Sequence, residues 1–283
     1  MSDTFERSAA DAYCSLLAGG HYENFIVASR LAHPRIRRDL TRIYAFCRST
    51  DDLGDESGDA ALPRLHRWQD EVGAMFAGRA PVHPVLVALQ ETVERLDMPG
   101  EPFLDLIAAN IQDQRVDHYD SWSDLQAYCQ LSAAPVGRMV LKVFGINGSA
   151  ATRLSDDVCI GLQLANFAQD VSVDAAKGRC YLLAPEVERT GIAGAVKTHC
   201  DRARTLLASG YDLESMAPLP LRFQLALYRL GGLAICAAIE RRGYRTGASR
   251  PTVSTASKAM TLARALFRLF RRGEQHVGSA ETA

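Results

Sequence analysis

The sequence contains two Asp-x-x-x-Asp motifs, each set in an apolar stretch with helical spacing. The first runs from Asp51 to Asp55 and the second from Asp170 to Asp174. Residues four apart on a helix lie on one face, so each motif would present a pair of carboxylates. Buried carboxylates need a compensating cation, and Mg²⁺ is typically held by one or two carboxylates together with substrate phosphates. The sequence therefore predicts two acidic faces opposed across a cavity, in a Mg²⁺-dependent enzyme that acts on a diphosphate.

Apolar residues recur at three- and four-residue spacing along most of the chain, which is typical of amphipathic helices. This spacing predicts helices over residues 36–47, 103–111 and 154–167. Alternating runs of β-branched and aromatic residues bounded by hairpin turns are not found in the sequence. Prolines and glycines fall between the predicted helices, without a serine- or glycine-rich linker. We predict an all-α fold, a single domain over residues 1–283 around a central cavity, with 274–283 as a flexible tail.

Charge balance and cysteine usage argue against several other classes of protein. The 283 residues include 33 acidic and 32 basic side chains, so no nucleic acid partner is expected. Seven cysteines are scattered without a Cys-x-x-Cys pair, which argues against zinc and against a disulfide framework. The N-terminus lacks the apolar core of a signal peptide, and the best apolar run, 230–239, is too short to span a bilayer. We expect a cytoplasmic protein, with peripheral contact to the inner face of the membrane as an open alternative.

A single Asp-x-x-x-Asp motif on a helix is more often a solvated surface than a site. Two features favour a site here: the motif occurs twice among apolar neighbours, and each copy has cations beside it. Arg48 precedes the first motif, while Lys177 and Arg179 follow the second. Diphosphate carries several negative charges, and basic side chains bind its oxygens through strong charge-assisted hydrogen bonds.

The stretches around both motifs resemble the two signatures of the squalene/phytoene synthase family. They read YAFCRSTDDLGD over residues 44–55, and NFAQDV followed by GRCYL over residues 166–182. The resemblance implies the all-α prenyl-synthase (terpenoid synthase-like) fold, Mg²⁺, and head-to-head chemistry on prenyl diphosphates. The glycine fingerprint of dinucleotide-binding proteins is missing from the sequence, and no nicotinamide cofactor is expected.

The resemblance also implies roles for individual residues. Metal binding and catalysis are implied for the four aspartates Asp51, Asp55, Asp170 and Asp174, with Asn166 as an amide ligand and Tyr44 beside the diphosphate. Contacts to the substrate are implied for Phe25, Arg48, Tyr128, Gly137, Asn166, Gln169, Lys177, Arg179 and Tyr181.

Two segments resemble one branch of the family, the bacterial hopanoid-pathway hydroxysqualene synthases. Asn24 stands where serine is common, Ser29 stands where many relatives carry an aromatic residue, and residues 132–138 read SAAPVGR. This branch converts presqualene diphosphate and water to hydroxysqualene and diphosphate. The alternative is a presqualene diphosphate, squalene or phytoene-type synthase that condenses two prenyl diphosphates such as farnesyl diphosphate. Other enzymes of the pathway are candidate partners, whereas a non-enzymatic assembly factor is not expected, because all four aspartates are present.

Several other polar residues have two open interpretations. His21 would orient diphosphate or be structural, and residues 113–115 would pair across the cavity or form an interhelical salt bridge. Arg250 lies where relatives place a C-terminal lid, although a solvated helix end explains it equally well. Residues 261–272 combine an apolar stripe with a basic flank, which suits a helix lying on an anionic membrane or a docked terminal helix.

Overall fold

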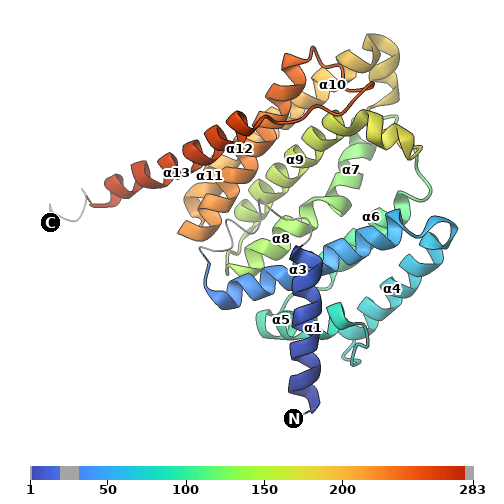
Figure 1. Cartoon of the computed structure of the whole chain (residues 1–283), viewed down its shortest axis with the longest axis vertical. Coiled ribbons are helices and arrows are strands. Elements are labelled where there is room, and N and C mark those ends of the chain that lie inside the picture. The colour runs from blue at the N-terminus through green and yellow to red at the C-terminus, as the bar shows by residue number, and fades with distance from the viewer. Residues whose placement is uncertain (1, 20–31, 278–283) are drawn as a thin grey trace. The chain divides into compact units, whose positions relative to one another are not determined.

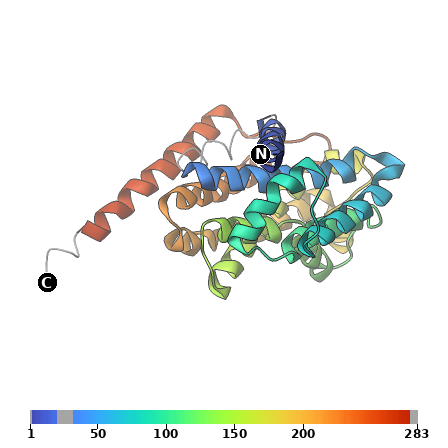
Figure 2. The same ribbon diagram turned by 90° about the horizontal axis from the view of Figure 1, so that it is seen from below.

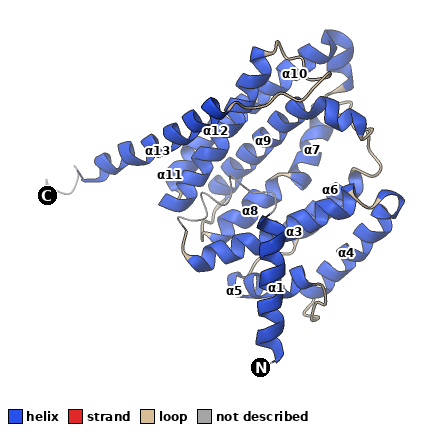
Figure 3. Cartoon of the chain, viewed as in Figure 1, coloured by secondary structure: helices blue, strands red, loops and turns tan. Residues whose placement is uncertain are grey.

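The computed structural model describes residues 2–19 and 32–277, with side chains described for 7–19 and 32–267. Within these ranges every regular element is helical, apart from one isolated β-bridge between Tyr119 and Leu183 (Figures 1 and 3). The all-α prediction is confirmed. The three periodic segments form the helices α3 (Pro34–Asp55), α6 (Glu101–Gln112) and α9 (Ser149–Ala176).

The chain forms two compact units. Unit 1 comprises Met1–Asp117 and Ser123–Thr152, and unit 2 comprises His118–Trp122 and Arg153–Ala283. This division does not decide between one domain and two, so the prediction of a single domain stays a prediction. The predicted tail beginning at residue 274 also stays a prediction, although the last helix continues to Val277.

Unit 1 is arranged around α3. Five helices of this unit contact α3. They are α1 (Ser2–Gly19), α4 (Ala61–Phe76), α5 (Pro84–Leu96), α6 and α8 (Ala134–Val143). A short 3₁₀ helix, η1 (Gly58–Ala60), and α7 (Trp122–Ser132) complete the unit.

Arg42 lies in the interior of unit 1 and is matched there by acids from two neighbouring helices. Its Nε and Nη2 donate to Asp11 of α1 over 2.7 and 2.9 Å, and Nη2 also donates to Glu91 of α5 over 2.8 Å. Its Nη1 donates to Thr92 Oγ1 over 3.1 Å. The Arg42 side chain is only 2% exposed, so losing either acid would leave a desolvated charge poorly compensated. The network joins α1, α3 and α5.

An aromatic cluster fixes the half of α3 that carries the first acidic motif. The Phe46 ring stacks on Trp68 of α4 at 5.8 Å and meets Phe103 of α6 edge-on at 5.1 Å. Trp68 Nε1 donates to Thr50 Oγ1 over 3.0 Å, which satisfies the buried indole N–H. The apolar face of α3 is therefore held on two sides, and its opposite face is left for polar residues.

Unit 2 contains the second acidic motif on α9 and four further helices. α12 (Leu219–Arg241) packs against α10 (Ala184–Ala208), α11 (Gly210–Met216) and α13 (Thr255–Val277). A buried ion pair joins α11 to α12, with Arg229 Nε donating to Glu214 Oε1 over 2.7 Å. The same guanidinium lies 3.8 Å from the centre of the Tyr211 ring, which adds a cation–π contact.

Prolines begin helices here more often than they separate them, which refines the sequence-based boundaries. Pro34 and Pro84 are the first residues of α3 and α5, each preceded by a histidine whose Nδ1 accepts a backbone N–H of the first turn. Proline is favourable at this position because its missing N–H would have no helical partner. His33 and His83 thus act as N-caps that the sequence analysis did not identify.

Among the described helices, only α12 is long and apolar enough to cross a bilayer by length and composition. Of its most apolar window, 56% is buried against the rest of the protein. A core helix meets the same test, and the contacts of α12 with α10, α11 and α13 are those of a core helix.

Candidate functional site

The first acidic motif lies in the last two turns of α3. Asp51 and Asp55 are one turn apart on the face that also carries Tyr44 and Arg48, and both aspartates are exposed. The C-terminal end of a helix carries a partial negative charge, which makes it an unfavourable place for carboxylates. No basic residue occupies the last turn of α3. The position therefore favours a cation supplied from elsewhere.

The protein around Asp51 disfavours the ionised form of its carboxyl group. The pKa of Asp51 is raised to about 6, mainly by desolvation and also by the charge of Asp55, while a hydrogen bond from Asn110 opposes the shift. The Asp51 side chain keeps contact with solvent, so the protein desolvates it without enclosing it. Carboxylates with a raised pKa in an accessible position are typical of functional sites, because a bound cation relieves the penalty.

Two amide side chains support this motif, Asn110 on α6 and Gln114 in the turn that follows it. Asn110 Nδ2 donates to Asp51 Oδ1 over 3.3 Å and to Leu106 O over 3.1 Å, and Gln114 Nε2 donates to the Gly54 carbonyl over 3.2 Å. The close approach depends on Gly54, because a Cβ there would lie 2.6 Å from Asn110 Oδ1. The sequence analysis noted Gln114 but missed Asn110. Asn110 could have been identified from the sequence as an amide inside the otherwise apolar run that forms α6.

Arg48, a predicted diphosphate contact, binds two other acids of the same segment. Its Nη2 lies 2.6 Å from Asp52 Oδ1 and 3.4 Å from Glu56 Oε1. Spacing of four residues explains the first pair, since such residues are neighbours on a helix. The diphosphate role of Arg48 stays a prediction, and it requires the guanidinium to share or leave these acids.

The other predicted residues of unit 1 lie on α7 and α8. The Tyr128 side chain is buried, and its hydroxyl donates to Asp113 Oδ2 over 2.7 Å. Gly137 is buried on α8. Near them, Ser132 Oγ is a buried atom without a hydrogen-bond partner among the described residues. Phe25, together with His21, Asn24 and Ser29, lies outside the described residues.

The second acidic motif forms a polar stripe along α9. Asn166, Asp170 and Asp174 follow one another at four-residue spacing, with Asn166 exposed and both aspartates half-buried. Their neighbour Gln169 is buried, and its Nε2 donates to the Pro251 carbonyl over 2.7 Å. The loop between α12 and α13 is therefore fastened to α9 beside the acidic motif.

Arg250, in the same loop, binds the carboxylate of Asp170 at both oxygens. Its Nε donates to Oδ1, its Nη2 donates to Oδ2 over 3.2 Å, and Nη2 also donates to Gln169 Oε1 over 3.3 Å. The two-point geometry is the strong form of an arginine–carboxylate pair. A metal ion at Asp170 would compete with this guanidinium. The sequence analysis noted Arg250 only by its position, because its partner is far away in the chain.

The end of α9 places two predicted cations next to Asp174. The Asp174 carbonyl accepts the N–H of Arg179 over 2.9 Å, and the Ala175 carbonyl accepts the N–H of Gly178 over 3.1 Å. Gly178 has a φ of 73°, which a residue with a side chain rarely adopts. This pair of bonds is a Schellman motif, which closes the helix and turns the backbone of residues 177–179 back toward the Asp174 carbonyl.

Tyr181 is fixed by stacking and by a buried histidine. Its ring stacks on Phe167 with centroids 4.0 Å apart and planes 7° apart, and the Tyr119 ring lies 6.1 Å away on unit 2. His199 Nε2 lies 3.0 Å from the Tyr181 carbonyl. Its Nδ1 lies 3.2 Å from the Ala195 carbonyl, and burial lowers the pKa of the ring, whose neutral form donates to one of these two carbonyls. The segment following the second motif is thus held rigidly on α9.

Each unit offers one pair of carboxylates on a helix. Over the described ranges, His, Cys, Asp and Glu side chains do not gather in threes or more at distances suited to a metal ion. Pairs of hard oxygen donors fit Mg²⁺, which keeps several waters and completes its shell with phosphate oxygens. The donor set therefore suits Mg²⁺ bound together with a phosphorylated substrate, and it argues against zinc, which prefers nitrogen and sulfur ligands.

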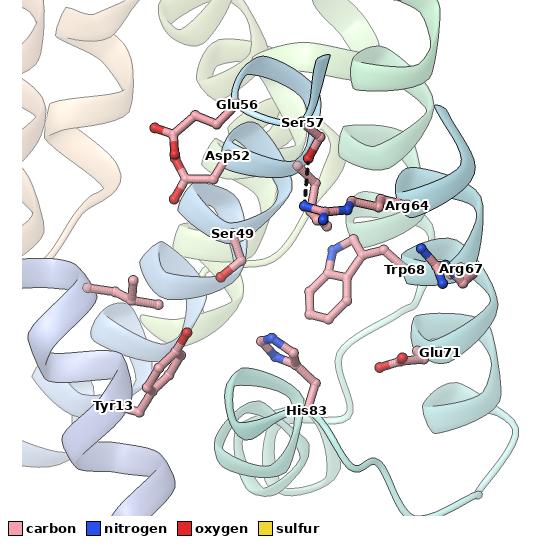
Figure 4. A pocket seen from close by; sticks show the side chains of 12 residues that line it. Tyr13, Ser49, Asp52, Glu56, Ser57, Arg64, Arg67, Trp68, Glu71 and His83 are labelled. Atoms are coloured by element: carbon pink, nitrogen blue, oxygen red, sulfur yellow. Dashed lines mark hydrogen bonds between the residues drawn. The ribbon is translucent and has the colours of Figure 1, made fainter. Parts of the chain in front are cut away.

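A separate cavity of about 540 Å³ lies on another face of α3 (Figure 4). It is bounded by Asp52 of α3, by Glu56 just after that helix, and by Arg64 and Trp68 of α4. Arg64 Nη1 donates to Ser57 Oγ over 3.3 Å. Asp51 and Asp55 point elsewhere on the helix and do not line it. This cavity is therefore distinct from the predicted metal-binding face.

Solved structures share the fold of this chain. A squalene synthase HpnC from Alicyclobacillus acidocaldarius is 41% identical, with a TM-score of 0.79 over 85% of this chain and 96% of that one. A dehydrosqualene synthase in complex with ligand has a TM-score of 0.84 over 95% of this chain and 99% of that one. At 21% identity the second similarity concerns the fold alone. The predicted all-α prenyl-synthase fold is confirmed.

Sequence comparisons agree with the structures. Phytoene synthase 3 of Zea mays is 30% identical over 92% of this chain, and the phytoene synthase of the Oncidium hybrid cultivar is 28% identical. This chain spans only about two thirds of the maize protein, 66% of its length. The sequence model described as squalene/phytoene synthase matches residues 18–257. The chain belongs to the squalene/phytoene synthase family.

Proposed function

We propose that this protein is a Mg²⁺-dependent enzyme that converts presqualene diphosphate and water to hydroxysqualene and diphosphate. The observation that carries the proposal is the 41% identity with a squalene synthase HpnC, against 28–30% with plant phytoene synthases. The paired carboxylates of α3 and α9 support the general chemistry, because both pairs have the donors and spacing that a Mg²⁺–diphosphate complex needs.

Asp51 and Asp55 on one unit, and Asp170 and Asp174 with Asn166 on the other, would hold the metal ions. When bound, Mg²⁺ would supply Lewis-acid assistance to departure of the diphosphate. Arg250 competes for Asp170, so its guanidinium has to release at least one carboxylate oxygen when a metal binds there.

Lys177 and Arg179 would bind the phosphate oxygens. The Schellman turn at Gly178 fixes the backbone of both residues next to Asp174, so neither has to be recruited from a distant loop. Arginine binds phosphate through two parallel hydrogen bonds, whereas lysine contributes a compact charge. Both interactions grow stronger as negative charge develops on the leaving group, which is the condition for lowering a barrier.

The carbocation that remains must be protected until rearrangement is complete. The stacked rings of Tyr181 and Phe167 offer an aromatic surface that excludes water and stabilises positive charge through its quadrupole. Ser132 Oγ, buried and without a described partner, has the hydrogen-bonding capacity to hold one water molecule. Capture of the cation by that water forms a C–O bond and releases one proton, giving the alcohol.

A second candidate is head-to-head condensation of two prenyl diphosphates, as in a presqualene diphosphate, squalene or phytoene-type synthase. It is favoured by the curated relatives, which are phytoene synthases matching 92% of this chain. The same carboxylates and cations would serve that reaction, because it also begins with loss of diphosphate. The two candidates differ in substrate and in what quenches the last cation.

The deciding experiment supplies presqualene diphosphate or farnesyl diphosphate with Mg²⁺ in ¹⁸O-labelled water, with and without NADPH, and identifies the products by mass spectrometry. The proposal expects an ¹⁸O-labelled alcohol from presqualene diphosphate without NADPH. An unlabelled hydrocarbon that requires NADPH would move the protein to the squalene synthases, and a C30 product from farnesyl diphosphate alone would favour condensation. Ser132→Ala should shift the product from alcohol toward a hydrocarbon formed by proton loss.

A further inference from the structure

The last helix of the chain leaves an apolar arc uncovered. Ala265 of α13 is fully buried, and α13 packs against α12. On other sides of the same helix, Met260 is 54% exposed, Leu262 39% and Leu266 40%. The C-terminal part of α13 extends past the other helices of unit 2 (Figures 1 and 2). One face of α13 is therefore docked, while a second, apolar face meets solvent.

The first nineteen residues of this helix carry charge of one sign only, before Glu274 near its end. Residues 255–273 contain five basic residues and no acidic residue, in a chain whose net charge is −1. Two of these cations, Lys258 and Arg264, are exposed in the described part of the helix. Helical spacing places Lys258 next to Leu262 and Arg264 next to Met260, because both pairs are four residues apart. Cations thus border the apolar arc on both edges.

We propose that α13 docks this protein on an anionic lipid bilayer surface. An apolar arc bordered by lysine and arginine suits the headgroup boundary, where apolar side chains enter the acyl region and long cationic side chains reach the lipid phosphates. A protein partner fits less well, because lysine is depleted in protein–protein interfaces. The inference goes beyond the proposed reaction and does not depend on it.

The test measures binding of the full-length protein to sedimenting vesicles without substrate. Vesicles of phosphatidylcholine alone are compared with vesicles of equal parts phosphatidylcholine and phosphatidylglycerol, at low and high salt. We expect binding only to the anionic vesicles, weakened by salt. Lys258→Gln and Arg264→Gln should each weaken binding about fivefold, the ratio corresponding to about 1 kcal/mol per cation at such a surface.

Matched controls separate docking from general surface effects. Leu266→Asp should strongly reduce binding, whereas Leu16→Asp on α1, where the leucine is 78% exposed, should not. Arg189→Gln, an exposed arginine of α10, is the control for charge. Circular dichroism and thermal unfolding verify that each variant is folded.

Three outcomes would overturn the proposal. They are equal binding to neutral and anionic vesicles, no binding to either, and binding that Leu266→Asp leaves unchanged. Self-association in light scattering that disappears in Leu266→Asp, without any vesicle binding, would assign the arc to a second copy of this chain. Failure of the vesicle assay leaves the proposed reaction untouched, because no catalytic step is measured.

Discussion

Replacing Gly54 by alanine tests the support of the first acidic motif. The added methyl group would lie 2.6 Å from Asn110 Oδ1, so the amide has to move by several tenths of an ångström. That amide is also the donor to Asp51 at 3.3 Å, near the limit of a hydrogen bond. We expect Gly54→Ala to break this bond while leaving α3 helical.

The size of the effect follows from two opposed terms. Alanine in place of glycine stabilises a helix by up to about 1 kcal/mol. Loss of a hydrogen bond to a charged group costs about 1.5–3 kcal/mol, and the lower end applies here because Asp51 is solvent-exposed. The free energy of unfolding should therefore change little. Activity should fall about tenfold for each 1.4 kcal/mol by which the misplaced Asp51 carboxylate raises the activation free energy.

Gly54→Ala should shift the pH dependence of activity in a defined direction. The pKa of Asp51 is raised to about 6 even though the Asn110 hydrogen bond lowers it. Without that bond the pKa rises further, and the ionised carboxylate needed for metal binding is lost at a higher pH. The acid limb of the kcat/KM profile should therefore move to higher pH in Gly54→Ala.

Gly73→Ala in the last turn of α4 is the matched control, because nothing lies within 4 Å of its added methyl group. Urea unfolding should show Gly73→Ala to be the more stabilising change by about 1–2 kcal/mol, with activity unaltered. A double-mutant cycle with Asn110→Ala should remove the penalty of Gly54→Ala. If Gly54→Ala stabilises as much as Gly73→Ala and keeps full activity, the supporting role of Asn110 is refuted.

Four further outcomes are expected. Asp170→Asn should remove most activity with unchanged helical circular dichroism, and full activity with unaltered Mg²⁺ dependence would contradict the metal role. Arg179→Ala should weaken inhibition by inorganic diphosphate; inhibition as tight as in the parent would make this arginine structural. Burial lowers the pKa of His83, so its neutral ring contributes to the free energy of unfolding above about pH 6.5, and this contribution is lost at lower pH. His83→Asn should keep the N-cap, and urea unfolding of this variant should not show the loss of stability at low pH. Arg42→Met should lower the free energy of unfolding by about 3–5 kcal/mol in urea, because it leaves Asp11 and other acids without their cation, and a change below about 1 kcal/mol would refute that.

The helices could be predicted because their signal is local. Apolar spacing in 36–47 and 103–111 follows from packing one face of a helix, and the structure has α3 and α6 there. The division into two units could not be predicted, since its boundaries fall inside α7 and α9 without a change of composition. Histidine caps were missed because histidine is an uncommon N-cap, even though each precedes a proline.

At the candidate site, local sequence patterns do not predict the partners of the acidic residues. The two motifs read alike in sequence, yet their surroundings differ in charge. Asp170 is matched by Arg250, eighty residues further along the chain, whereas the nearby cation of the first motif, Arg48, is bound to Asp52 and Glu56.

Asp51 accepts a hydrogen bond from a neutral amide of α6, and desolvation raises its pKa although this amide and the charge of Arg48 lower it. Asp170 is therefore compensated by a cation of the protein itself, whereas Asp51 lowers its electrostatic energy most when an external cation binds. Identical spacing predicts the same metal ligands in both motifs, but partners from distant helices and loops determine the charge around each aspartate.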